Sequence, residues 1–316
     1  MIPKNTGEPG RWRQRRFDSL FRWVSLTCAA CIIVIVMGVL AELIYGARLS
    51  IAETGIRFLY SLKWNPVTQQ FGALSSVFGT LVSTAIAMVI AVPLALVIAL
   101  FLTELAPPVL ATAVGGAIEL LAAIPSIIFG MWGLFVFAPF MSEYVQPFLG
   151  RVGGSLPFFQ GPPMGIGMLT AGIILALMIL PFITTVSREV FAMVPPVVKE
   201  SAYGLGSTTW EVTGKVTVRY GIQGVVGACF LGLGRAIGET MAVTFVIGNT
   251  HRISSSLFAA GNSIASTLAN EFTEATADIY LSSLVELGLV LFLITALIQA
   301  AAQFWLWRMG RRMGDV

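Results

Sequence analysis

Charged residues are scarce in this chain of 316 residues. They make up 11% of the composition, while hydrophobic residues make up 56%. A soluble domain usually carries about 25% charged residues, so the composition excludes an ordinary soluble protein and predicts several membrane spans surrounded by lipid. The formal net charge is only +3, which gives no basis for binding nucleic acid.

Cysteine and histidine are also scarce, with three cysteines and one histidine. Cys28, Cys31 and Cys229 all lie in apolar runs, and His251 stands alone beside the end of a predicted span. The CxxC at residues 28–31 lacks the second ligand pair that a structural zinc site needs. We therefore expect neither a metal site nor a disulfide, and we interpret the cysteines as small packing residues.

The signatures of common enzymes are missing too. The sequence contains no HExxH or GxSxG motif. Four acidic residues are isolated near span ends or on helix faces: Glu42, Glu104, Glu119 and Glu286. Gly214-Lys215 is the one Gly-Lys pair, and a P-loop would need glycine where Thr209 stands and serine or threonine where Val216 stands. We predict that the chain is not an enzyme and that it does not hydrolyse ATP.

Six apolar runs are long enough to cross the ~30 Å hydrocarbon core of a membrane. They cover residues 23–44, 74–102, 109–140, 165–187, 223–247 and 283–307. The first run is long for a signal peptide and has no small-residue cleavage site after it, so we expect it to be retained. Pro125-Ser126 divides the third run and predicts a bend there. The sequence therefore predicts an all-α protein with six transmembrane helices.

Basic residues indicate the orientation of these helices. Lysine and arginine gather in residues 1–23, in the 188–222 loop and after the last span, and they are fewer in the loops at 45–70, 141–164 and 249–282. Because basic residues favour the cytoplasmic side, both termini and the 188–222 loop are predicted to be cytoplasmic. We expect residues 1–23 to form a disordered or interfacial tail, and the 45–70 loop to be periplasmic with room for an interfacial helix.

The polar segment at 195–219 has the signals of two short helices at a bend. Pro195-Pro196 suits a helix start, because proline at the first helical position loses no intrahelical hydrogen bond. Gly204 and Gly206 allow a sharp exit, with Tyr203 near the corner. A short helix at such a turn can bind in a groove of another protein and transmit its motion. An ordinary cytoplasmic loop is the alternative.

The second of these helices is marked by Thr208 and Glu211, which have the spacing of a capping box. We expect this helix to be short and to lie outside the membrane, before the fifth span begins.

The fifth predicted span contains a charged pair. Arg235 and Glu239 are four residues apart, so on one helix they would share a face. A charge in the middle of a membrane costs at least ~2.5–3.5 kcal/mol, so both side chains should face protein or a water-filled path. Two interpretations remain open: a salt bridge that holds packing, or an arginine that offers its guanidinium to an oxyanion. We expect Arg235, Glu239 and the adjacent Thr240 to line a substrate pathway.

The stretch Glu200-Ser201-Ala202, followed three residues later by Gly206, resembles the EAA loop of ABC importer permeases. In that family this turn is the coupling helix, which binds in a cleft of the ATPase subunit. The resemblance implies coupling roles for Glu200, Ser201, Ala202, Tyr203, Gly204 and Gly206. The family pattern continues as Ile-x-Leu-Pro, where this chain has residues 216–219 as VTVR. Arg219 in place of proline puts the exit geometry of the second helix in question.

Two further stretches are similar to the PstC-type permeases of phosphate importers. They are GLGRAIGETMAV at 232–243 and LAAIPSIIFGMWG at 121–133, and the resemblance covers about residues 71–312. It implies a type I importer permease in a bacterial inner membrane that passes phosphate inward by alternating access. It also places Arg235 and Glu239 on charged positions implicated in that passage.

The resemblance also implies partners and a division of the chain. The partners would be a PstA-type second permease, two PstB-type ATPases that bind ATP and Mg, and a PstS-type periplasmic phosphate-binding protein. The division is a basic tail at 1–23, a first transmembrane helix and periplasmic loop at 24–70, and an ABC permease domain at 71–312 with its EAA coupling loop at 195–219. Two alternatives remain: a permease for another oxyanion such as molybdate or sulfate, and a phosphate-sensing scaffold that transports nothing.

Overall fold

The computed structural model describes residues 10–154 and 156–314, and the regular secondary structure in this part of the chain is helical, with one isolated β-bridge between Asn65 and Gln70. The helices are α1 Gly10–Thr54, α2 Arg57–Tyr60, α3 Leu74–Leu100, α4 Pro108–Ala122, α5 Ser126–Trp132, α6 Ala138–Phe140, α7 Gln146–Gly153, α8 Met168–Ala192, α9 Pro196–Gly204, α10 Thr209–Glu211, α11 Val218–Ile237, α12 Met241–Val246, α13 Ile264–Glu271 and α14 Asp278–Gly314. Four π-helical segments join them, namely η1 Phe101–Leu105, η2 Gly133–Phe137, η3 Met141–Val145 and η5 Val212–Thr217, together with one 3-10 turn, η4 Pro157–Phe159.

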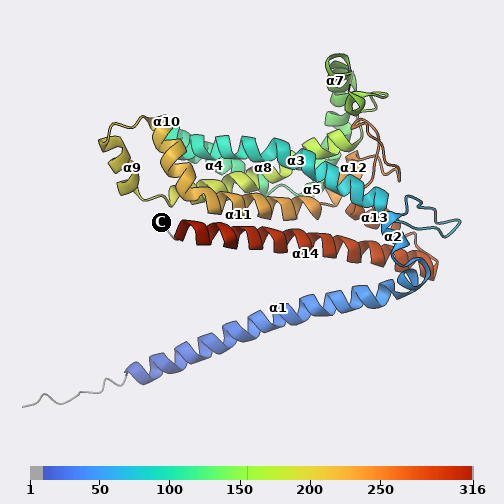
Figure 1. The fold of residues 1–316 in the computed structure, drawn as a ribbon, viewed down its shortest axis with the longest axis horizontal. Helices are drawn as coiled ribbons and strands as arrows, with labels where there is room; N and C mark the ends of the chain where they lie inside the picture. The colour runs from blue at the N-terminus through green and yellow to red at the C-terminus, as the bar shows by residue number, and fades with distance from the viewer. Residues whose placement is uncertain (1–9, 155, 315–316) are drawn as a thin grey trace, which may run out of the picture.

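Six helical stretches in the described residues are long and apolar enough to cross a membrane. They are Leu20–Thr54, Leu74–Leu105, Ser126–Gly153, Met168–Ala192, Thr209–Ile237 and Asp278–Arg311. The predicted all-α fold with six spans is therefore confirmed. The start of α1, the end of α14 and the short helix α9 all lie at one end of the molecule, while α2, α7 and α13 lie at the other (Figure 1).

The third span differs from the prediction. Residues 109–140 do not form one bent helix: α4 ends at Ala122 and α5 begins at Ser126, with Pro125 in an extended conformation between them. Proline has no N–H to continue the helical ladder, so the chain leaves the helix there. The span then runs on to Gly153, well into the region predicted as the 141–164 loop. The 249–282 loop likewise contains α13.

The first helix is longer than predicted at both ends. Of the predicted basic tail, residues 1–9 lie outside the described residues, and from Gly10 onward the chain is helical. Residues 45–54, predicted as loop, extend the same helix, and α2 follows it. The C-terminal end of α1 is attached to α14 by Ser282, whose hydroxyl donates to the carbonyl of Gly46 (2.8 Å) and accepts from the amide of Ser50 (3.0 Å). Toward its beginning α1 diverges from α14 (Figure 1).

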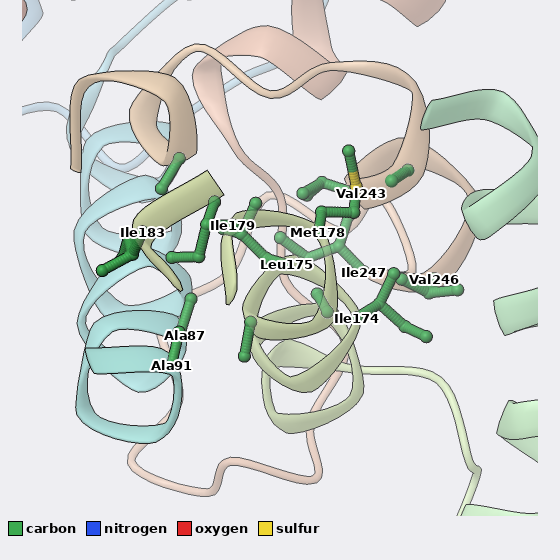
Figure 2. Packing of buried hydrophobic residues seen from close by; sticks show 14 of the residues in the cluster. Ala87, Ala91, Ile174, Leu175, Met178, Ile179, Ile183, Val243, Val246 and Ile247 are labelled. Carbon is green, nitrogen blue, oxygen red and sulfur yellow. The ribbon is translucent and has the colours of Figure 1, made fainter. Parts of the chain in front are cut away.

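The main core lies between α3 and α8. The two helices come close because α3 presents a stripe of buried alanines, which include Ala87, Ala91 and Ala95. Ile174 and Ile179 of α8 belong to the same buried cluster, together with Val243 and Val246 of α12 (Figure 2). Small residues allow this close approach where lipid offers no hydrophobic driving force between helices. α8 is thereby a fixed support for α11 and α12.

A polar cluster joins segments at the end of the molecule that holds α2 and α13. Glu271 of α13 accepts hydrogen bonds from His251 (2.9 Å), Tyr280 (2.7 Å) and the indole N–H of Trp64. Burial alone would raise the pKa of Glu271, but these three donors outweigh it and hold the pKa below its ordinary value. A carboxyl group with a lowered pKa stabilises the fold at pH values above its ordinary pKa. That stabilisation is lost as the pH falls through the lowered pKa. The cluster therefore holds the loop around Trp64 to the segment that runs from His251 to Tyr280 at neutral pH.

Gly79 of α3 gives a test of this packing. A Cβ at Gly79 would overlap the backbone carbonyl of Asn262, whereas a Cβ at Gly116 in α4 would meet open space. We expect Gly79→Ala to destabilise the protein by about 1–3 kcal/mol or more, as overpacking does, and Gly116→Ala to cause no loss. Thermal unfolding of the two purified variants in detergent measures this difference. Equal melting temperatures would contradict the close contact between α3 and the loop at Asn262.

Candidate functional site

The first candidate region is the turn at α9. Pro195 occupies the N-cap position and Pro196 begins the helix, so its start follows the two prolines. The turn closes when the amide of Gly206 donates to the carbonyl of Tyr203 (2.9 Å) and the amide of Ser207 donates to that of Ala202 (3.2 Å). Gly206 has φ of +86°, a conformation that residues with a side chain rarely adopt. The corner therefore depends on glycine at this position.

The surface of α9 is open. None of its residues is buried, and it stands apart at the end of the helical bundle (Figure 1). Of the six residues that the resemblance assigns to coupling, Glu200, Ser201, Tyr203, Gly204 and Gly206 are exposed and Ala202 is half-buried. Exposed apolar side chains lie on and beside the turn: Val197, Val198, Tyr203, Leu205 and Trp210. A convex helix edged by apolar side chains has the character of a surface that binds in a groove of another protein.

The helix after the turn differs from the prediction. The capping box forms, because the amide of Glu211 donates to the Thr208 hydroxyl (3.4 Å) and the amide of Thr208 donates to the Glu211 carboxylate (3.1 Å). This helix is not short, however: α10, η5 and α11 form one continuous stretch, Thr209–Ile237. Arg219 lies inside it. Arginine retains the backbone N–H that proline lacks, so the helix passes through this position without a break.

An ion pair connects α9 to the second span. The Lys199 ammonium donates to the Glu104 carboxylate (2.6 Å), and the hydroxyl of Thr217 donates to the same carboxylate oxygen (3.1 Å). Glu104 was expected to be isolated, and that expectation is wrong. Its side chain is only 7% exposed, so it needs these partners. The sequence offered one signal: an acid after the end of the second span and a base in the 188–222 loop, two segments predicted to lie on the same side of the membrane.

The second candidate region is the charged pair, and its helix is broken. Instead of a continuous span over 223–247, α11 ends at Ile237 and α12 begins at Met241. Gly238 to Thr240 form the break, where the amide of Glu239 donates to the carbonyl of Ala236 (3.3 Å). Arg235 and Glu239 therefore do not share one helical face, and the argument from their four-residue spacing is wrong.

The two charged side chains have different surroundings. The Glu239 carboxylate accepts from the amide of Ala242 (3.4 Å) at the start of α12, where the helix dipole favours negative charge. Arg235 is exposed, and its guanidinium carbon lies 5.9 Å from the centre of the Phe182 ring of α8. In the described part of the chain, no salt bridge joins Arg235 to a carboxylate. Thr240 donates its hydroxyl to the carbonyl of Gly238 (3.3 Å).

Helix α5 packs against α12, the helix that follows this break. A Cβ at Gly130 would come within 2.7 Å of Phe245 and 3.0 Å of the Ala242 backbone. A Cβ at Gly133 would come within 2.9 Å of Val246. The two glycines of the 121–133 stretch thus let α5 pack directly on α12. The helix break at Pro125-Ser126 lets α5 run toward α12. The amide of Ala242 in α12 in turn donates to the Glu239 carboxylate and holds it in position.

The arrangement can bind an anion, but no chemical reaction is apparent. An exposed arginine within a span presents five N–H donors in a planar fork that matches an oxyanion. Among the described residues, no group of three or more His, Cys, Asp or Glu side chains is placed to hold a metal ion.

No family model matches the chain, but curated relatives cover nearly all of it. The phosphate transport system permease protein PstC of Mesorhizobium japonicum is 53% identical over 307 residues, which is 95% of this chain and 94% of that protein. The protein of the same name from Xylella fastidiosa strain Temecula1 is 49% identical over 321 residues, covering 100% and 99%. PstC 1 of Mycobacterium tuberculosis is 37% identical over 83% of this chain.

Solved structures with a similar fold are also ABC transporters. One is a bacterial ABC transporter involved in the import of alginate, with a TM-score of 0.60, 16% identity and coverage of 92% of this chain and 98% of that one. Another is the methionine transporter MetNI in an inward-facing conformation, with a TM-score of 0.52, 19% identity and coverage of 75% and 94%. At these identities the likeness shows the fold alone. The sequence relatives confirm the resemblance seen in the motifs, and the chain belongs to the family of PstC phosphate transport system permease proteins.

Proposed function

We propose that this chain is the PstC-type permease subunit of an ATP-driven importer, which passes inorganic phosphate from a periplasmic binding protein to the cytoplasm by alternating access. The observation that carries the proposal is Arg235, an exposed cation within a span that has no carboxylate at ion-pair distance in the described residues. Such a charge is costly in a membrane unless it faces water or an anion. The names of the relatives support phosphate as that anion.

Arg235 alone does not discriminate between oxyanions. Its guanidinium binds phosphate, sulfate or molybdate through the same planar donors. We therefore assign selectivity to the binding protein that delivers the substrate, and keep transport of molybdate or sulfate as the alternative. Glu239 and Thr240 lie beside Arg235 at the helix break, and we place both in the pathway. Glu239 repels an anion, so it keeps the path from trapping phosphate at the arginine.

Energy comes from a partner, because the chain has no P-loop. We propose that α9 binds in a PstB-type ATPase dimer, which holds ATP and Mg, and that a PstA-type permease forms the other half of the pathway. The exposed residues Glu200, Tyr203 and Gly206 form the contact turn. A scaffold that senses phosphate without moving it would also use α9. It would have no need of an arginine inside a span, so Arg235 favours transport.

The membrane orientation is part of the proposal. We place α9, the start of α1 and the end of α14 in the cytoplasm of a bacterial cell. We take the membrane that the six helices cross to be the inner membrane of that cell. The three lie at the same end of the molecule (Figure 1), and basic residues gather near them.

Removal of the charge at Arg235 tests the pathway. We expect Arg235→Gln to reduce phosphate uptake by about 10- to 100-fold, because a hydrogen bond to a charged group contributes ~1.5–3 kcal/mol. Uptake of labelled phosphate into proteoliposomes that hold the assembled complex measures this. The control is Arg219→Gln, which removes an exposed arginine from the same helix and should leave uptake unchanged. Undiminished uptake by Arg235→Gln would exclude the pathway role.

Changes at the turn test the contact with the ATPase. Tyr203→Ala removes an exposed side chain, and Gly206→Val introduces a β-branched residue at φ of +86°, which strains the corner. We expect less ATPase to co-purify with both variants and phosphate-stimulated ATP hydrolysis to fall. Gly214→Ala is the control, because a Cβ there meets open space. If both variants retain ATPase and its turnover, α9 is not the contact.

Labelling tests the orientation. The three native cysteines are first replaced by alanine, and single cysteines are then placed at Ser255 and Thr209, which are both exposed. A membrane-impermeant maleimide added to spheroplasts should label Ser255→Cys, and it should label Thr209→Cys only after lysis. Labelling of both from the same side would contradict the six-span topology.

A further inference from the structure

The contact between Glu104 and Lys199 lies at the base of α9. Its nitrogen–oxygen distance is 2.6 Å, and the two side chains are 7% and 19% exposed, respectively. The exposed pair of Lys215 and Glu211 has exposures of 76% and 41%. Exposed pairs contribute little to stability, but loss of one member of a buried pair leaves a charge without a partner. The Glu104–Lys199 pair therefore constrains where α9 can lie.

This pair is the one side-chain hydrogen bond or salt bridge that joins α9 to another element within the described residues. The other side-chain hydrogen bond of α9 is internal, from the Ser201 hydroxyl to the carbonyl of Val197. Apart from Lys199, α9 is held by its packing against η5, which lies at the start of the fifth span's helix, and by its chain connections to α8 and α10. Neither connection reaches α3. Glu104 is thus the direct polar contact through which α9 meets the second span.

Glu104 also contacts the fifth span at a distinctive place. It lies in η1, the π-helical end of the second span, and Thr217 ends η5, the π-helical segment before α11. π-helical segments are rare, and they often mark functional sites. Here two of them meet through one carboxylate, directly beside the helix that we assign to ATPase binding.

We propose that Glu104 is a positioning residue that makes α9, the second span and the fifth span move together when the ATPase moves α9. The proposal rests on the proposed function, since it requires α9 to be the contact with the ATPase. Without Glu104, motion of α9 would reach the fifth span through its packing on η5 and through the chain connections, and no direct polar contact would carry it to the second span. With it, α3 and the α8 core packed on α3 follow the same motion, and Phe182 of α8 keeps its place beside Arg235.

The test uses the assembled complex in proteoliposomes and measures co-purified ATPase, ATP hydrolysis and phosphate uptake. Glu104→Gln should retain the ATPase and its basal hydrolysis but lose most of the phosphate taken up per ATP hydrolysed. The charge swap of Glu104→Lys with Lys199→Glu should restore coupling. Thr217 can follow the swap, because a hydroxyl both donates and accepts. Lys215→Gln, which breaks only the exposed pair, should leave the ratio unchanged.

Wild-type uptake per ATP in Glu104→Gln would overturn the proposal, as would an assembled charge swap that stays uncoupled. If Glu104→Gln does not assemble, Thr217→Val carries the test, because it keeps the ion pair and removes only the contact to η5. The same loss of coupling is then expected, and normal coupling refutes the role. Failure of the proposed function gives a different result, since Tyr203→Ala would then leave ATPase binding intact or the wild-type complex would take up no phosphate.

Discussion

Hydrocarbon solvates neither a charge nor an unpaired backbone amide, so polar groups within the spans need partners. Hydroxyls meet this requirement inside their own helices: Thr184 donates to the carbonyl of Leu180 and Thr244 to that of Thr240. Glu104 meets it by accepting from two other elements. Arg235 departs from the pattern, because it has an aromatic ring beside it and, within the described residues, no carboxylate at ion-pair distance. That departure is the reason we propose a route for an anion at Arg235 and not a helix bundle that only packs.

The break between α11 and α12 follows from the same constraint. Ending a helix frees backbone groups, and the chain satisfies several of them locally with Glu239, whose amide donates to Ala236 and whose carboxylate accepts from Ala242. Close packing of Gly130 against α12 then holds the broken segment in place. The glutamate therefore contributes to the fold at the helix break. Its presence does not require a salt bridge to the arginine.

The spans and the α9 turn could be predicted from the sequence because their signals are local: long apolar runs, two prolines, a glycine and a capping box. The helix break at Gly238 could not, because no proline marks it and apolar residues continue on both sides of the 238–240 segment. It depends on α5, which is distant in the sequence. The contact between Glu104 and Lys199 joins residues 95 positions apart, and it forms only because η1 ends beside α9. The continuation of the fifth helix through Arg219 likewise could not be predicted from the sequence, and only the backbone of the structure shows it.

The uninterrupted helix Thr209–Ile237 has 29 residues and, at 1.5 Å per residue, is about 40 Å long. A rod of that length amplifies small rotations. If it pivots beside α9, a tilt of about 5° would carry the other end, with Arg235, sideways by roughly 3–4 Å. Such a shift is comparable to the size of a tetrahedral oxyanion. A change at the ATPase too small to rearrange the bundle would then suffice to move the arginine from one side of a passing ion to the other.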